Sequence, residues 1–164
     1  MTASRIGELL DDLQRSYDGD PWHGSSLTVL LDGVTASVAI ATPIASVHSI
    51  WALVLHLTAW TDEVRLRLEG KAPDAPPQGD WPAVPTHPTP EAWRAAQDAL
   101  RDAQRALEAA VAALPHTMLD AIVGGERDPA LGAGLTYAAT IRGLVQHHAY
   151  HGGQIAILRK ALER

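Results

Sequence analysis

Histidines near the end of the sequence occupy positions where an apolar helical stripe would otherwise continue. His147 and His151 are four residues apart, which in an α-helix places them on one face, about 6 Å apart along the axis. Gln154 follows three residues later on the same face. An interior imidazole needs partners for its ring nitrogens, and a shared metal ion supplies one to each ring. The H-x3-H segment therefore predicts a metal site.

Spacing alone does not decide which histidine pairs with His151. His148 and His151 are three residues apart, a separation that helical bundles also use for metal ligands. A histidine pair of either kind can also be hydrogen-bonded inside a bundle that holds no metal. From the residues alone, His148 is thus an alternative metal candidate to His147.

A third ligand is expected from another helix, because two histidines rarely complete a metal site. His56 is the best candidate, since it lies in an apolar helical segment with Leu53 and Trp60 on its face. Three histidines leave one coordination position open, as in catalytic rather than structural zinc sites. The chain has no cysteine, and imidazole ligands suit Zn, Ni, Fe or Co but suit Ca poorly.

Apolar periodicity predicts the elements that must position these histidines. Thr89 is a good N-cap, followed by Pro90 at the first helical position. A short helix is expected over 25–32, whereas 35–45 could be extended or irregular. Segment 71–88 contains six prolines and predicts a long crossover loop. Long helices are predicted over 4–17, 46–68, 90–114 and 136–163.

Four long helices with two long connections predict an all-α, four-helix-bundle fold in a single domain over 1–164. Apolar residues make up 46% of the chain and the net charge is −6, without a cluster of basic residues. Duplex nucleic acid is therefore not expected as a partner. No apolar run reaches the length of a membrane span, and the polar, acidic start is unlike a signal peptide. We expect a cytoplasmic protein with no membrane partner.

Other catalytic patterns are missing from the sequence. The glycine-rich stretch IVGGERDPALGAG lacks the Lys-Ser/Thr of a phosphate-binding loop, and no G-x-S-x-G nucleophile motif occurs. No residue is assigned a catalytic role from the sequence; the histidines are predicted as metal ligands.

Two short motifs resemble those of the DinB/YfiT-like metalloenzyme superfamily. One is SIWALVLHLTAW at 49–60, which is similar to the family's histidine in an HL…W context. The other is HHAYHGGQIAILRKAL at 147–162, which is similar to its late H-x3-H-x2-Q. The proline-rich crossover and the chain length also agree, so the resemblance runs through most of the sequence.

The resemblance implies an up-down-down-up four-helix bundle with long crossover loops and one divalent metal. It assigns the ligands to His56, His147 and His151, and so prefers His147 to His148. Gln154 is expected to orient His151 or a ligand. Zn or Ni is the expected metal, with Fe, Co or Mn as alternatives. A homodimer is also implied.

Some members of this superfamily are transferases or isomerases that use a low-molecular-weight thiol such as bacillithiol or mycothiol. The predicted function is accordingly a divalent-metal-dependent enzyme, such as a thiol S-transferase acting on a small-molecule substrate. The alternative is a non-catalytic metal-binding stress or interaction protein. His48 is expected to have a surface or capping role, and exposed loop positions are expected for His23, His87 and His116.

Overall fold

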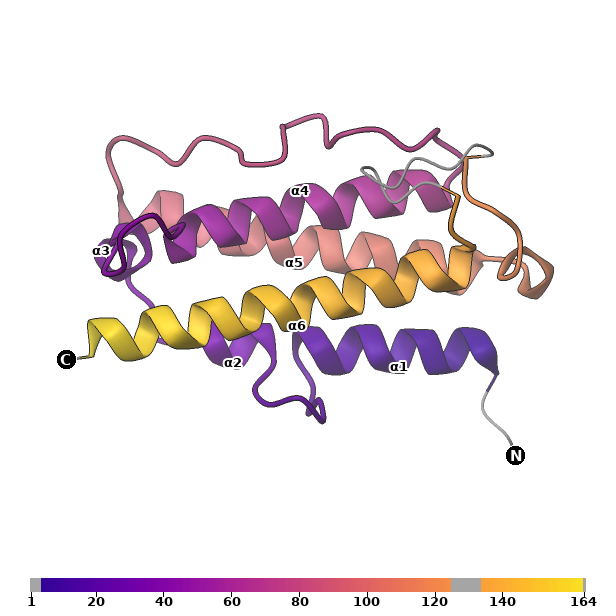
Figure 1. The fold of residues 1–164 in the computed structure, drawn as a ribbon, viewed down its shortest axis with the longest axis horizontal. Helices are drawn as coiled ribbons and strands as arrows, with labels where there is room; N and C mark the ends of the chain where they lie inside the picture. Colours follow the sequence, from indigo (N-terminus) through magenta and orange to yellow (C-terminus); the bar gives the residue numbers. More distant parts are fainter. Residues whose placement is uncertain (1–3, 125–133, 164) are drawn as a thin grey trace.

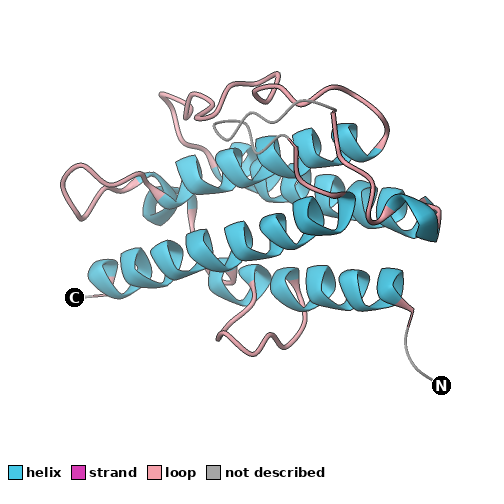
Figure 2. Ribbon diagram, turned by 45° about the vertical axis from the view of Figure 1, so that its right-hand side comes forward, coloured by secondary structure: helices cyan, strands magenta, loops and turns pink. Residues whose placement is uncertain are grey.

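The structure is a computed structural model that describes residues 4–124 and 134–163. These residues form helices and loops (Figure 2) and no strand, apart from an isolated bridge between Ile122 and Thr136. The all-α prediction is confirmed. The helices are α1 (Arg5–Tyr17), α2 (Leu27–Leu31), α3 (Ala36–Ile40), α4 (Ile50–Leu68), α5 (Pro90–Ala113), the 3-10 turn η1 (His116–Met118) and α6 (Tyr137–Leu162).

Side-chain caps fix where the long helices begin. Thr89 accepts a hydrogen bond from the backbone N–H of Ala92 and Pro90 is the first helical residue, as predicted. The helix expected from Ser46 begins instead at Ile50, where Ser49 provides the cap. Ser46 has a φ of 62°, in the left-handed region that a helix cannot contain. The undecided segment 35–45 contains the short helix α3.

The four long helices lie side by side (Figure 1). α1 and α6 run in one direction and α4 and α5 in the other. α4 packs against both α5 and α6, and α1 packs against α5 and α6. The crossover from α4 to α5 follows the length of α4 back to the start of α5. The glycine-rich stretch expected before α6 lies partly outside the described residues.

Two apolar clusters fill the bundle, toward its opposite ends. The first includes Trp51, Leu57, Trp93, Leu100 and Ile155. The second includes Leu13, Val64, Leu107, Ile141 and Leu144. Between them in sequence, each long helix contributes one polar side chain other than the Glu63 carboxylate that is at most 2% exposed. This polar layer consists of Ser16, Thr61, Gln104 and His148.

A buried ion cluster ties the start of the crossover to α4. The Glu63 carboxylate is fully buried and accepts hydrogen bonds from Arg67 Nε at 3.2 Å, Lys71 Nζ at 3.0 Å and the Asp74 backbone N–H at 3.0 Å. These donors balance the charge that burial would otherwise leave unpaired. None of the described helices is both long and apolar enough to cross a membrane.

Candidate metal centre

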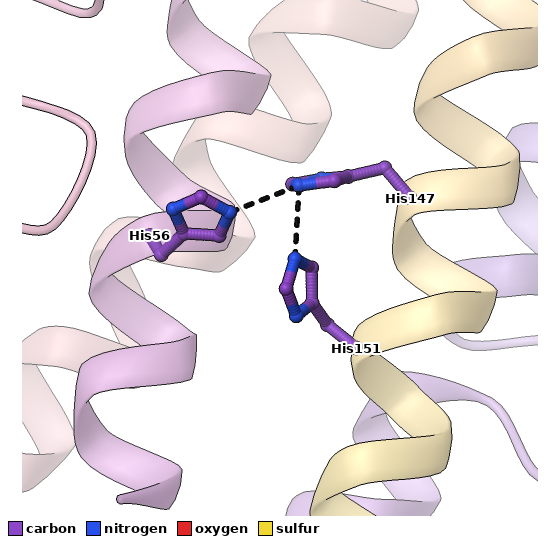
Figure 3. Close-up of side chains that lie close together, drawn as sticks. All are labelled: His56, His147 and His151. Atoms are coloured by element: carbon purple, nitrogen blue, oxygen red, sulfur yellow. Dashed lines mark hydrogen bonds between the residues drawn. The ribbon is translucent and has the colours of Figure 1, made fainter. Parts of the chain in front are cut away.

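Three histidines from two helices converge on one point between α4 and α6 (Figure 3). His56 comes from α4, and His147 and His151 come from α6. His147 Nε2 lies 3.0 Å from His56 Nε2 and 3.0 Å from His151 Nε2. One nitrogen from each ring lies within 4.8 Å of the others. The structure thus brings together the three residues expected from the sequence.

Helix geometry explains why these rings meet. His147 and His151 are one turn apart on α6, so their side chains project from the same face. His56 lies near the middle of α4, which packs against α6 along this face. His56 and His151 are only 5% and 4% exposed, so most of the water that would solvate a charged ring is excluded.

The outer nitrogens of two rings have oxygen acceptors. His56 Nδ1 donates to the Asp80 backbone carbonyl at 2.5 Å, and His151 Nδ1 donates to Gln154 Oε1 at 2.6 Å. Each Nδ1 therefore carries the proton, and each Nε2 presents a lone pair toward the centre. Gln154 occupies the orienting position expected for it, in the arrangement by which a neighbouring acceptor fixes the ring of a ligand histidine.

His147 cannot satisfy both neighbours by hydrogen bonding. Its Nε2 faces two lone pairs but can carry at most one proton. Its Nδ1 is buried and has no hydrogen-bond partner among the described residues. If that nitrogen holds the proton, all three Nε2 atoms face one another with lone pairs alone, and a cation would relieve this arrangement.

Burial keeps all three rings neutral. Desolvation lowers the pKa of His147 to about 3, and the neighbouring His151 and His56 add to the shift. Desolvation is also the main cause that lowers the pKa of His56 and that of His151. Neutral imidazole is the form that binds metals.

The donor set fits a divalent transition metal. Metal–nitrogen bonds of 2.0–2.1 Å at a tetrahedral ion would separate the nitrogens by about 3.3 Å, close to the two separations of 3.0 Å. The family prediction of metal ligands therefore agrees with the orientation, spacing and protonation of these side chains. These three histidines could hold a metal ion.

A clamp from the crossover holds His56 in place. Trp81 stacks on the His56 ring, with centroids 4.0 Å apart and planes 10° apart. The opposite face of Trp81 stacks on His48 at 3.5 Å. Asp80 Oδ1 accepts from Trp60 Nε1 at 2.7 Å, which fixes the Asp80 residue whose carbonyl accepts from His56. We call Asp80 and Trp81 the loop clamp.

Sequence reasoning missed the loop clamp. Asp80 and Trp81 lie in a proline-rich segment without periodicity, and an aromatic residue in such a segment was the only available signal. His48 was expected at the surface or at a cap; it is exposed and also stacks on Trp81. His23, His87 and His116 are exposed and outside the histidine cluster.

His148 points away from the cluster into the polar layer. Its Nδ1 lies 3.3 Å from Ser16 Oγ and its Nε2 lies 3.4 Å from Thr61 Oγ1. Ser16 Oγ donates to the Leu13 carbonyl, so it accepts from Nδ1, and Thr61 then donates to Nε2. Burial lowers the pKa of His148 to about 4. The alternative metal candidate thus has hydrogen-bond partners of its own.

A cavity of about 380 Å³ borders the cluster on one side, and His56 and His147 form part of its wall. We call this cavity the α4–α6 groove. Its other described lining residues are Trp60, Val64, Arg67, Asp80, Leu135, Thr140, Gly143 and Leu144.

A comparison of the sequence with known protein families identifies a family whose match includes the three histidines of the cluster. The family model described as the DinB superfamily matches residues 22–155, a range that includes His56, His147 and His151. No curated protein matches the chain, and no solved structure matches it. The family match spans most of the sequence, and the chain belongs to the DinB superfamily.

Proposed function

We propose that this protein is a divalent-metal-dependent enzyme in which His56, His147 and His151 bind the ion through Nε2. The observation that carries the proposal is the convergence of three neutral imidazoles beside the α4–α6 groove. A storage or structural site needs no adjoining cavity, whereas an enzyme needs space for a substrate next to the ion. Zn or Ni is favoured, with Fe, Co or Mn as alternatives.

The reaction we propose is transfer of a low-molecular-weight thiol to a small electrophilic substrate. A bound divalent cation lowers the pKa of a thiol or water in its open position and so supplies a nucleophile at neutral pH. The thiol comes from outside because the chain has no cysteine. The thiol releases its proton to solvent, its sulfur forms the new S–C bond, and the leaving group departs with the electron pair of the bond that breaks.

The chain's own residues orient the components. Gln154 and the Asp80 carbonyl hold the rings of His151 and His56 in the tautomer that exposes Nε2. The buried surroundings of His147 disfavour its protonated form at neutral pH. Membership in the DinB superfamily supports the thiol step, because the resemblance implies that some members use low-molecular-weight thiols.

Metal content is the first test of this proposal. Protein purified without a histidine tag is expected to contain about one transition-metal ion per chain by elemental analysis. His147→Ala is expected to lose the metal, while the neighbouring variant His148→Ala keeps it, since His148 faces Ser16 and Thr61. Equal metal content in the two variants would contradict the ligand assignment.

Turnover is the second test. Metal-loaded protein is incubated with electrophiles and a panel of bacterial thiols that includes bacillithiol and mycothiol, and conjugates are measured by mass spectrometry. Conjugation that depends on the metal and on His147 is expected. One ion per chain with no conjugation to any thiol would favour the alternative function, a non-catalytic metal-binding stress or interaction protein.

The homodimer implied by the family stays a prediction. Light scattering of the metal-loaded protein measures its mass directly, and a mass of one chain would contradict it.

A further inference from the structure

The α4–α6 groove extends from the histidine cluster in one direction. On α4 its wall passes from His56 through Trp60 and Val64 on successive turns. On α6 it passes from His147 through Gly143 toward the start of the helix. His56 to Arg67 spans eleven positions, or about 16 Å of helix. His151 is not part of this wall, so the groove opens on the side of the cluster between His56 and His147.

The groove presents little polarity to a ligand. Trp60, Val64, Leu135 and Leu144 supply apolar surface, and Gly143 leaves space. A Cβ built at Gly143 would have no described neighbour within 4 Å. The groove therefore has a mainly apolar wall with open volume at one helical position.

Apart from the two histidines, the polar side chains in the wall already have protein partners. The Thr140 hydroxyl donates to the Thr136 carbonyl, and Asp80 Oδ1 accepts from the Trp60 indole. Arg67 donates to Glu63 and, at 3.0 Å, to the Asp74 carbonyl. An anionic ligand group placed here would lose water without gaining a dedicated counter-charge, because Arg67 is already paired with Glu63.

The volume sets the size of the ligand. A protein cavity of about 150 Å³ holds benzene, so a groove of about 380 Å³ accommodates a group of one to two rings.

We propose that the α4–α6 groove binds the uncharged, aromatic or branched aliphatic part of the substrate, of one to two rings, while its reactive group lies at His56 and His147. This assignment of substrate class rests on the proposed function. It predicts that the enzyme selects substrates by an apolar tail and rejects a negative charge on that tail.

The first experiment uses the metal-free protein and therefore does not depend on the ion. Benzyl alcohol, a neutral aromatic probe, is titrated up to about 10 mM, which covers millimolar dissociation constants. NMR follows the signals of the Trp60 indole N–H and the Gly143 amide. Both signals are expected to shift in a saturable way. Gly143→Leu fills the open position and is expected to remove the Trp60 shift.

Gly153→Leu is the matched control. Gly153 lies on the same helix, and a Cβ there also has no described neighbour within 4 Å, but it does not line the groove. This variant is expected to respond like wild type. Both substitutions replace a helical glycine by a better helix former, and Gly143→Ala provides a smaller step should the leucine variant fail to fold.

The second experiment uses zinc-loaded protein and hydroxamates that share one metal-binding head. Benzohydroxamate is expected to bind about 10- to 100-fold more tightly than acetohydroxamate, because its ring is buried. Gly143→Leu should lose this difference and Gly153→Leu should keep it. A 4-carboxylate on the ring should also remove it.

The outcomes separate the two proposals. Zinc binding with equal affinity for the two hydroxamates, or an unchanged difference in Gly143→Leu, overturns the groove assignment and leaves the metal centre standing. No zinc binding, with a saturable benzyl alcohol shift that Gly143→Leu abolishes, supports the groove and overturns the proposed function. Absence of any benzyl alcohol shift in wild type counts against the groove.

Discussion

The polar layer makes the bundle sensitive to acid, and His148 supplies a measurable part of that sensitivity. The ring is 1% exposed, and burial lowers its pKa to about 4, whereas an unfolded chain holds histidine near 6.5. The unfolded state therefore binds the proton first as the pH falls. The free energy of unfolding that depends on neutral His148 is intact above pH 6.5 and decreases as the pH falls from 6.5 toward 4.

The size of the effect follows from the two pKa values. Between pH 8 and pH 5, proton binding to the unfolded state lowers the free energy of unfolding by about 2 kcal/mol for this one group. The loss reaches about 3.4 kcal/mol once the pH is below both pKa values. For a domain with a total stability of about 5–15 kcal/mol, either loss is readily measured.

Urea unfolding of metal-free protein at pH 8 and pH 5, in the presence of a chelator, measures this loss. Wild type also contains the three histidines of the cluster, so the comparison is with His148→Asn, which removes the titrating ring. The decrease in the free energy of unfolding from pH 8 to pH 5 is expected to be about 2 kcal/mol smaller in His148→Asn than in wild type. His116→Asn, at an exposed position in the 3-10 turn η1, serves as a control, and its free energy of unfolding should decrease as that of wild type does. An equal decrease in His148→Asn and wild type would refute the reasoning.

Three further predictions concern the surroundings of the histidine cluster. Gln154→Leu removes the acceptor for His151 Nδ1 and is expected to weaken metal binding about 10- to 100-fold in competition with a chromogenic chelator; unchanged affinity would contradict the orienting role. Trp81→Ala leaves His56 without its stacked partner. Metal affinity is expected to fall by up to about tenfold, since such contacts contribute about 0.5–1.5 kcal/mol, and the urea midpoint of the metal-free protein should change little. A loss of overall stability without a change in metal affinity would show a structural role alone. Glu63→Ala leaves the buried Arg67 without its carboxylate partner. The free energy of unfolding is expected to fall by about 3–5 kcal/mol, as measured by thermal or urea unfolding. A loss below about 1 kcal/mol would contradict a stabilising role of the buried ion cluster.

The long helices could be predicted because each is encoded locally. Apolar spacing and cap residues gave three of the four long helices to within about two residues, as expected where periodicity is strong. The exception was the start of α4, where Ser46 and Ser49 both resemble N-caps. Ser46 has a left-handed backbone conformation, so the helix begins after Ser49 instead. No local sequence pattern reveals this conformation.

The candidate site was predictable only in part. Spacing put His147 and His151 on one face of a helix but could not exclude His148, because neighbouring residues differ by about 100° around the axis and the rotation of α6 in the bundle decides which one faces α4. The family motif supplied that choice. The loop clamp depends on a contact 24 residues away from His56 and involves no repeated pattern, so it became visible only in the structure.

The loop clamp also bears on the order in which the centre assembles. His56 and Asp80 are separated by 24 positions, and His56 and His147 by 91. Closing the shorter loop costs about 1.2 kcal/mol less chain entropy than closing the longer one. Folding is thus biased toward fixing the His56 ring on α4 before α6 docks. When α6 docks, it then packs against a His56 ring whose orientation is already fixed. Trp81→Ala should therefore refold more slowly than wild type, because that early contact is lost.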